Sequence, residues 1–131
     1  MIVLWGDHGW KLGDHNAWSK HTNFEVDTRV PLIISAPGMS EQGQQTDAFA
    51  ELLDVYPTLC DLAGIEQPSH LQGESLVPVL KDPASSVKET AYSIFPRYRN
   101  DDEQTVTGFS FRNERSGLGL LAPARSYSGK T

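Results

Sequence analysis

The sequence predicts an α/β protein with a mostly parallel sheet, followed by the start of a small antiparallel subdomain. Short apolar runs at residues 2–5 and 30–35 are typical of strands buried on both faces, as in a parallel sheet. Apolar side chains recur at helical spacing over residues 52–63. Residues 91–95 and 108–112 alternate in the manner of antiparallel strands.

Glycine and proline set the limits of the two buried strands. Gly6 ends the first, and Pro37 follows the second. Pro31 must lie at the start of its strand or on an edge, because it has no N–H to donate to a ladder. Residues 6–23 hold three glycines, mixed charges and no steady period, so a long ordered loop is expected there.

The helix is predicted to begin near Val55 or Tyr56, because Pro57 belongs in the first turn of a helix. Gly64 suits the residue that ends it. One more helical turn is expected at residues 75–80.

Domain organisation is predicted from the composition. Residues 81–86 read as a linker, so we expect one domain over residues 1–83 and the beginning of a C-terminal subdomain over residues 84–131. Residues 38–46 are polar and should be exposed. The tail, residues 116–131, is rich in glycine and serine and predicts no clear strand or helix.

Composition excludes several classes of protein. With 38% hydrophobic and 21% charged residues, the chain is not wholly disordered. The 11 basic residues are scattered and outnumbered by 17 acidic ones, which argues against a nucleic-acid binder. No apolar run is long enough for a membrane span. Cys60, the single cysteine, excludes an internal disulfide and a Cys-based zinc site, and it reads as a buried structural thiol.

The N-terminus has no features of a signal peptide, because Met1 leads straight into the first apolar run. A chain that starts inside a buried strand is expected to be a fragment of a longer protein.

Side chains that carry chemistry gather after the first strand. Asp7 follows it directly, and ligands of open α/β sheets collect at the carboxyl ends of strands. With the imidazole of His8 and the ammonium of Lys20, this carboxylate suits a divalent metal beside an anionic ester. The alternative is that Asp7 is only a turn or cap residue.

The order of several motifs resembles the sulfatases, within the alkaline-phosphatase-like superfamily. The resemblance covers about residues 2–112, and the segment at residues 91–97 is most similar to the iduronate-2-sulfatase branch. The other matching segments are residues 6–15, 18–20, 28–38, 53–64 and 73–76.

The resemblance implies a fold and a set of site residues. The fold is part of an α/β/α sandwich. Asp7 and His8 would be ligands of an active-site calcium ion, and Asp7 fits a hard cation better than an imidazole does. Lys20 would contact the sulfate group, and Trp10 would wall the substrate pocket. His15 would orient the loop or approach the substrate.

Three further residues of the motif region have open roles. Arg29 is expected to be an ion-pair partner rather than a ligand. His21 and Trp18 could equally form the core of the loop.

The resemblance also implies a nucleophile that this sequence lacks. Sulfatases use a formylglycine made within a Cys/Ser-x-Pro-x-Arg motif, and none is present here. The nucleophile is therefore expected upstream, and the isolated chain is expected to be inactive. The parent enzyme would be periplasmic, extracellular or lysosomal.

The expected activity of the parent is hydrolysis of sulfate esters of sugars, or of other small sulfate esters. One alternative is a phosphoester or phosphonate hydrolase of the same superfamily. The other is a non-catalytic remnant, which should be soluble and melt cooperatively, whereas a truncated sheet should expose an edge and aggregate.

Overall fold

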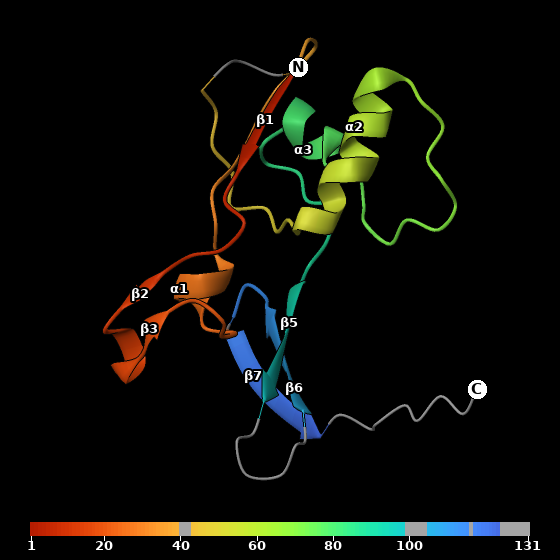
Figure 1. Ribbon diagram of the computed structural model, residues 1–131. Coiled ribbons are helices and arrows are strands. Elements are labelled where there is room, and N and C mark those ends of the chain that lie inside the picture. Colours follow the sequence, from red (N-terminus) through yellow and green to blue (C-terminus); the bar gives the residue numbers. More distant parts are fainter. Residues whose placement is uncertain (40–42, 99–104, 116, 124–131) are drawn as a thin grey trace, which may run out of the picture. The chain divides into compact units, whose positions relative to one another are not determined.

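A computed structural model describes residues 1–39, 43–98, 105–115 and 117–123 (Figure 1). The chain divides into two compact units. The first comprises Met1–Gly6 and Pro31–Ala91, and the second comprises Asp7–Val30 and the chain from Tyr92 onward. No helix among the described residues combines the length and apolar character that crossing a bilayer requires.

The sheet of the first unit has two antiparallel strands, β1 (Ile2–Trp5) and β4 (Leu32–Ser35). Their register pairs Ile2 with Ser35 and Trp5 with Leu32. Pro31 precedes β4, as expected, and its carbonyl accepts a hydrogen bond from the amide of Gly6 (3.0 Å). The prediction of parallel neighbours is wrong for this pair, because an apolar run signals burial but carries no information on the direction of the partner strand.

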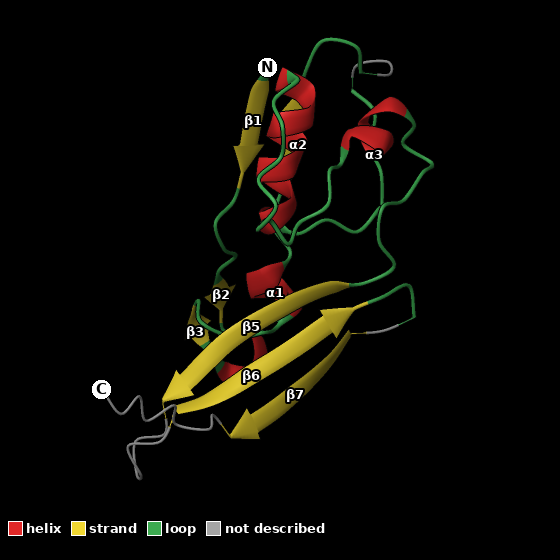
Figure 2. Ribbon diagram, turned by 90° about the vertical axis from the view of Figure 1, so that its right-hand side faces the viewer, coloured by secondary structure: helices red, strands yellow, loops and turns green. Residues whose placement is uncertain are grey.

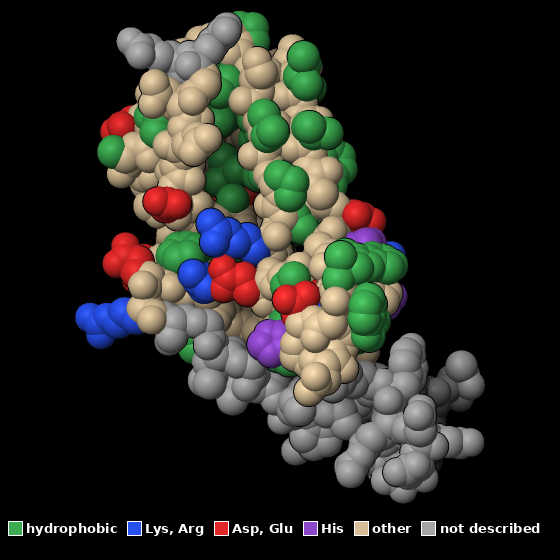
Figure 3. Space-filling view, turned by 90° about the vertical axis from the view of Figure 1, so that its left-hand side faces the viewer, with side chains coloured by type: hydrophobic (Ala, Val, Ile, Leu, Met, Phe, Trp, Pro, Cys, Tyr) green, Lys and Arg blue, Asp and Glu red, His purple; other side chains and the backbone are tan. Residues whose placement is uncertain are grey.

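Burial of these strands on both faces is also not found. Ile2, Leu4 and Ile33 expose 70%, 60% and 57% of their surface. Figure 3 shows hydrophobic side chains of this kind at the molecular surface. The two-stranded sheet therefore carries more apolar surface than the described residues cover, and the larger, mostly parallel sheet stays a prediction.

The helix of the first unit confirms the sequence prediction. A 3-10 turn, η2 (Leu52–Asp54), leads into α2 (Val55–Ala63), with Pro57 in the first turn. Gly64 ends α2 in the left-handed conformation, at φ 66°. A five-residue helix, α3 (Val77–Lys81), lies close to the turn expected at residues 75–80.

The core of the first unit is small. Among the described residues, its buried apolar side chains are those of Pro57, Cys60, Leu76 and Val79. Cys60 is a free, buried thiol, as predicted. The Thr58 hydroxyl, which is fully buried, accepts a hydrogen bond from the amide of Leu76 (2.8 Å) and so connects α2 to the segment before α3.

A buried ion-pair network surrounds the start of α2. The Nζ of Lys88 lies 2.7 Å from Oε2 of Glu51 and 2.7 Å from Oδ2 of Asp54, which is fully buried. The amide of Glu74 donates to the other oxygen of Asp54 (2.8 Å). Burial alone lowers the pKa of Lys88, but its hydrogen bonds to the two carboxylates outweigh burial, and the pKa lies above its ordinary value.

The expected loop at residues 6–23 contains a small hairpin. Its strands are β2 (Lys11–Leu12) and β3 (Trp18–Ser19), joined through a 3-10 turn, η1 (Asp14–Asn16). A four-residue helix, α1 (Glu25–Thr28), follows. Each element is too short for a periodic pattern, so the sequence predicted only ordered loop here.

The second unit also holds a three-stranded sheet in the order β5 (Ala91–Tyr98), β6 (Thr105–Arg112) and β7 (Gly117–Pro123). Its strands run in alternating directions in Figure 2, and β6 and β7 pair antiparallel. The antiparallel strands predicted at residues 91–95 and 108–112 are confirmed, and each extends further.

The sequence predicted no clear strand in the tail, and this prediction is wrong for residues 117–123, which form β7. This strand pairs with β6 in an unbroken register from Val106 opposite Pro123 to Arg112 opposite Gly117. A neighbouring strand can form a ladder with a glycine-containing segment whose own β propensity is weak. Residue 116 and residues 124–131 of the predicted atypical tail lie outside the described residues.

Candidate functional site

The carboxylate of Asp7 stands in solvent at the start of the second unit. Its side chain is 81% exposed. Oδ1 accepts a hydrogen bond from the amide of His8 (3.0 Å), and Oδ2 lies 3.3 Å from Nε2 of the same histidine. Because most of the carboxylate faces water, it is accessible to a ligand.

The imidazole of His8 is oriented by the backbone carbonyl of the next residue, Gly9. Nδ1 lies 2.8 Å from the carbonyl oxygen of Gly9, and a carbonyl can only accept, so Nδ1 carries the proton. Nε2 then has a lone pair, which accepts from the ammonium of Lys20 at 2.6 Å. A hydrogen bond from the second ring nitrogen to a backbone carbonyl is typical of metal-binding histidines.

Lys20 reaches His8 from the other side of the hairpin. Its neighbours Ser19 and His21 both have positive φ angles, 72° and 76°. Such angles are unusual for residues other than glycine, so the backbone is held in a constrained shape on both sides of the lysine. An ammonium has three donors, and the contact with His8 occupies one of them, which leaves two for an anion.

The structure thus brings together Asp7, His8 and Lys20, which the sequence analysis had proposed as one site. Trp10 lies beside them, with its ring centroid 6.2 Å from that of His8 and 53% of its surface exposed. His15 instead stacks on Phe24, at 4.1 Å between ring centroids. Its role in the site remains a prediction.

Two other residues of the motif, Trp18 and His21, lie on or next to β3 of the hairpin. Trp18 is 70% exposed, so the loop-core alternative is wrong for this residue. The reason is the alternation of the hairpin: Lys11 takes the inward position, and Leu12 and its cross-strand partner Trp18 point outward. The ring of His21 contacts Phe95 at 5.3 Å.

Arg29 pairs with Glu25 one turn earlier, at 3.4 Å between Nη1 and Oε1. This contact agrees with the ion-pair role expected from the sequence.

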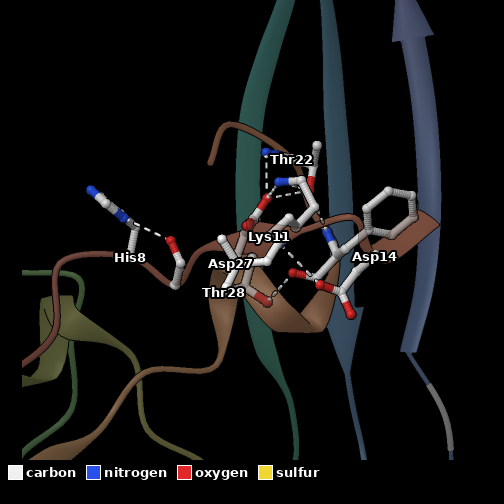
Figure 4. Close-up of polar contacts among 9 residues, drawn as sticks. His8, Lys11, Asp14, Thr22, Asp27 and Thr28 are labelled. Atoms are coloured by element: carbon white, nitrogen blue, oxygen red, sulfur yellow. Dashed lines mark hydrogen bonds and ion pairs between the residues drawn. The ribbon is translucent and has the colours of Figure 1, made fainter. Parts of the chain in front are cut away.

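Sequence reasoning missed a buried polar group beneath the hairpin. Figure 4 shows that the ammonium of Lys11 and the hydroxyl of Thr22 converge on the carboxylate of Asp27. Lys11 is fully buried and Asp27 is 5% exposed. No local signal could reveal this pair, because 16 residues separate the partners.

The pKa of Asp27 reflects these contacts. Burial acts to raise it, but hydrogen bonds from Lys11 and Thr22, together with the charge of Lys11, bring it below its ordinary value of 3.8. The carboxylate is therefore ionised wherever the protein is folded near neutral pH.

A calcium ion would need more oxygen donors than this cluster supplies. A hard cation takes 6–8 oxygen ligands. The exposed carboxylate of Asp7 fits. The Nε2 of His8 lies 3.3 Å from it, but its one lone pair accepts from Lys20 and would bind a metal only after that contact is released. The described residues contain no group of three or more His, Cys, Asp or Glu placed to hold a metal. The residues present thus fit part of such a site, and further ligands would be needed.

The family model described as N-sulphoglucosamine sulphohydrolase, C-terminal, matches residues 13–118 of this chain. Among curated proteins, a sulfatase of Formosa agariphila is 32% identical over 117 residues, which is 89% of this chain and 22% of the relative. Human iduronate 2-sulfatase is 35% identical over 92 residues, 52% of this chain and 17% of the relative.

Solved structures give similar results. A protein in complex with its substrate D-glucosamine-2-N,6-O-disulfate superimposes with a TM-score of 0.70 at 28% identity, over 93% of this chain and 27% of that one. A 2-O GAG sulfatase gives a TM-score of 0.73 at 31% identity, over 91% of this chain and 26% of the other. The chain therefore spans about a quarter of these structures and about a fifth of the curated relatives.

Proposed function

Because the chain belongs to the sulfatase family, we propose that it supplies part of the active site of a sulfuric ester hydrolase. The observation that carries the proposal is the cluster of Asp7, His8 and Lys20, which come from both sides of the hairpin and meet at hydrogen-bond distance. A hydrolase of sulfate esters needs groups that neutralise an anionic ester, and this cluster presents both a cation and an exposed carboxylate of the kind that a metal can bind.

Lys20 is proposed to hold the transferred sulfate. Two of its three donors are free of the contact with His8, so the ammonium has donors available for a sulfate oxygen. A positive charge placed in advance stabilises the charge that develops as the ester bond breaks.

Asp7 and His8 are proposed to hold a calcium ion beside that sulfate. The carboxylate is the stronger candidate, because a hard cation prefers oxygen. His8 would join it only when the ammonium of Lys20 turns from Nε2 to the sulfate. When bound, the ion would neutralise the charge of the sulfate oxygens. The other ligands and the formylglycine nucleophile are proposed to belong to a part of the enzyme outside these 131 residues.

Sulfated sugars are the proposed substrate class. One structural neighbour is a complex with a glucosamine disulfate, and one curated relative is an N-acetylglucosamine-6-O-sulfatase. The exposed ring of Trp10, next to His8, suits the apolar face of a sugar ring. Which sulfated sugar is bound depends on pocket walls beyond this hairpin.

The test is hydrolysis of an aryl sulfate and of a sulfated glucosamine by the longest polypeptide that contains these residues. We expect Lys20→Met to lower kcat/KM by about 100-fold or more, the usual effect of removing one charge-stabilising donor. Lys81→Met, at the exposed end of α3, is the matched control and should leave the rate unchanged.

Parallel assays separate the alternatives. The same polypeptide is assayed with an aryl phosphate beside the aryl sulfate. Faster turnover of the phosphate would show that the enzyme is a phosphoester hydrolase instead. The 131-residue chain alone should show no turnover with calcium. If it does hydrolyse sulfate esters and Asp7→Asn abolishes that activity, the expected inactivity is wrong but the assignment of the site to Asp7 is supported. If Asp7→Asn leaves the rate unaffected, the assignment of the site is contradicted.

A further inference from the structure

The buried polar group beneath the hairpin connects both sides of the candidate site. We propose that Lys11, Thr22 and Asp27 form a positioning unit, which holds His8 and Lys20 in contact without itself touching the substrate. The inference deepens the proposed function and rests on it for its relevance to catalysis.

Asp27 holds the side of the hairpin that carries Lys20. Its Oδ2 accepts a hydrogen bond from the amide of Thr22 (3.0 Å) and a second one from the Thr22 hydroxyl. Thr22 lies two residues after Lys20, and the intervening His21 has a positive φ of 76°. The two hydrogen bonds therefore fix the chain at the point where it leaves the strained segment around the lysine.

Asp27 also holds the side that carries His8. Its backbone carbonyl accepts from the amide of Gly9 (2.8 Å), and its Oδ2 accepts from the ammonium of Lys11. Gly9 and Lys11 lie one and three residues after His8. A single residue of α1 thus fixes both chain segments that must meet for His8 to contact Lys20.

The approach at Gly9 is close enough to exclude any side chain. A Cβ at this position would lie 1.8 Å from the carbonyl oxygen of Val26. Since the hairpin itself has only two paired positions on each strand, its own ladder is too short to define where its two ends lie. The contacts with α1 provide the missing constraint.

Stability alone does not account for a buried pair at this place. Apolar residues of similar volume often stabilise a protein as well as a buried ion pair does, whereas charged partners can define one geometry. In addition, Oδ1 of Asp27 is buried without a hydrogen-bond partner among the described residues. A group that loses its hydration without replacement opposes folding, so the arrangement is better explained by geometry than by stability.

The experiment measures the contact between His8 and Lys20 directly, by the NOE between the His8 ring protons and the Lys20 methylene next to Nζ. The wild-type chain should show the cross-peak. The double variant Lys11→Met/Asp27→Ala removes both charges together, which avoids leaving either buried and unpaired. We expect it to lose the cross-peak while the NOEs between β6 and β7 persist.

The matched control is Lys88→Met/Asp54→Ala, which removes the other buried Lys–Asp pair, in the first unit. We expect this control to lose about as much stability as Lys11→Met/Asp27→Ala and still to show the His8–Lys20 cross-peak. Loss of the cross-peak in both variants would mean that it reports stability only, and would overturn the proposal.

Two other results would also overturn it: a cross-peak that survives in Lys11→Met/Asp27→Ala, or one that is absent from the wild type. Where the double variant does not fold, Thr22→Val decides, because it removes only the hydroxyl hydrogen bond. We expect the cross-peak to weaken in Thr22→Val, and an unchanged intensity would refute the proposal. No metal, sulfate or turnover enters the measurement, so its outcome is independent of whether the proposed function holds.

Discussion

Replacing Gly9 by alanine tests how tightly the site loop is held against α1. The added methyl would lie 1.8 Å from the carbonyl oxygen of Val26 and 3.1 Å from the Cα of Asp27. Both are backbone atoms, so no side-chain rotation relieves the contact. The loop and α1 would have to separate by about 1.2 Å before the closest pair reached 3.0 Å.

The magnitude follows from two effects. Overpacking against backbone destabilises a protein by about 1–3 kcal/mol. The separation also breaks the 2.8 Å hydrogen bond from the Gly9 amide to Asp27, which contributes about 1 kcal/mol. We therefore expect Gly9→Ala to lower the free energy of unfolding of the second unit by about 2–4 kcal/mol.

The assay is equilibrium unfolding in urea, followed through the amide signals of β6. Gly64→Ala is the control, because Gly64 has a positive φ of 66° but open space around it. In that variant the free energy of unfolding of the first unit should fall by only about 1 kcal/mol, which is the backbone cost of alanine in this conformation. A Gly9→Ala variant as stable as the wild type would refute the close approach of the loop to α1.

Three further predictions concern buried titratable groups. The pKa of Asp27 is lowered on folding, so the ionised carboxylate stabilises the folded chain above its ordinary pKa of 3.8. This stabilisation is lost as the pH falls through the pKa of the folded state. Urea unfolding below about pH 4 should therefore show a loss of stability, and the loss should be smaller in Lys11→Met/Asp27→Ala. The pKa of Lys88 is raised, so its stabilisation is complete below 10.5 and declines as the pH rises above it; Lys88→Met should remove that alkaline decline, and a variant that retains it would exclude Lys88 as the cause. The thiol of Cys60 should react with a thiol reagent only after addition of denaturant, and fast labelling of the native chain would contradict its burial.

The parts of the fold that were predictable from sequence are those with local signals. Pro57 and Gly64 locate the first turn and the end of α2 by their own backbone preferences, and the structure places both where expected. The alternation at residues 91–95 likewise indicates β5. These signals need no knowledge of distant residues.

Pairing between distant segments could not be predicted in this way. The direction of β4 against β1 and the existence of β7 depend on partners elsewhere in the chain. The apolar composition of β1 and β4 suits a parallel as well as an antiparallel neighbour. In β7, the hydrogen bonds to β6 outweigh the low strand propensity of glycine.

In the candidate site, too, residues with a local sequence signal were predictable and residues that depend on a distant partner were not. Asp7, His8 and Lys20 could be found from sequence, because the motif that carries them is continuous and ends a predicted strand. Lys11 and Asp27 could not, because a lysine in a loop and an aspartate in a four-residue helix are normally solvated. Only the folded chain shows that they meet.

The most direct test of the central claim is whether the carboxylate of Asp7, next to His8, binds a divalent cation. Mn²⁺ is a paramagnetic hard cation that broadens nearby signals even when an incomplete set of ligands binds it weakly. In a titration of the ¹⁵N-labelled chain with millimolar Mn²⁺, we predict line broadening centred on the amides of residues 7–9 and on Lys20. Asp7→Asn should abolish it, and Asp14→Asn, at an exposed carboxylate of the same hairpin, should not. Broadening that is absent from these amides, or that persists in Asp7→Asn, would contradict the account.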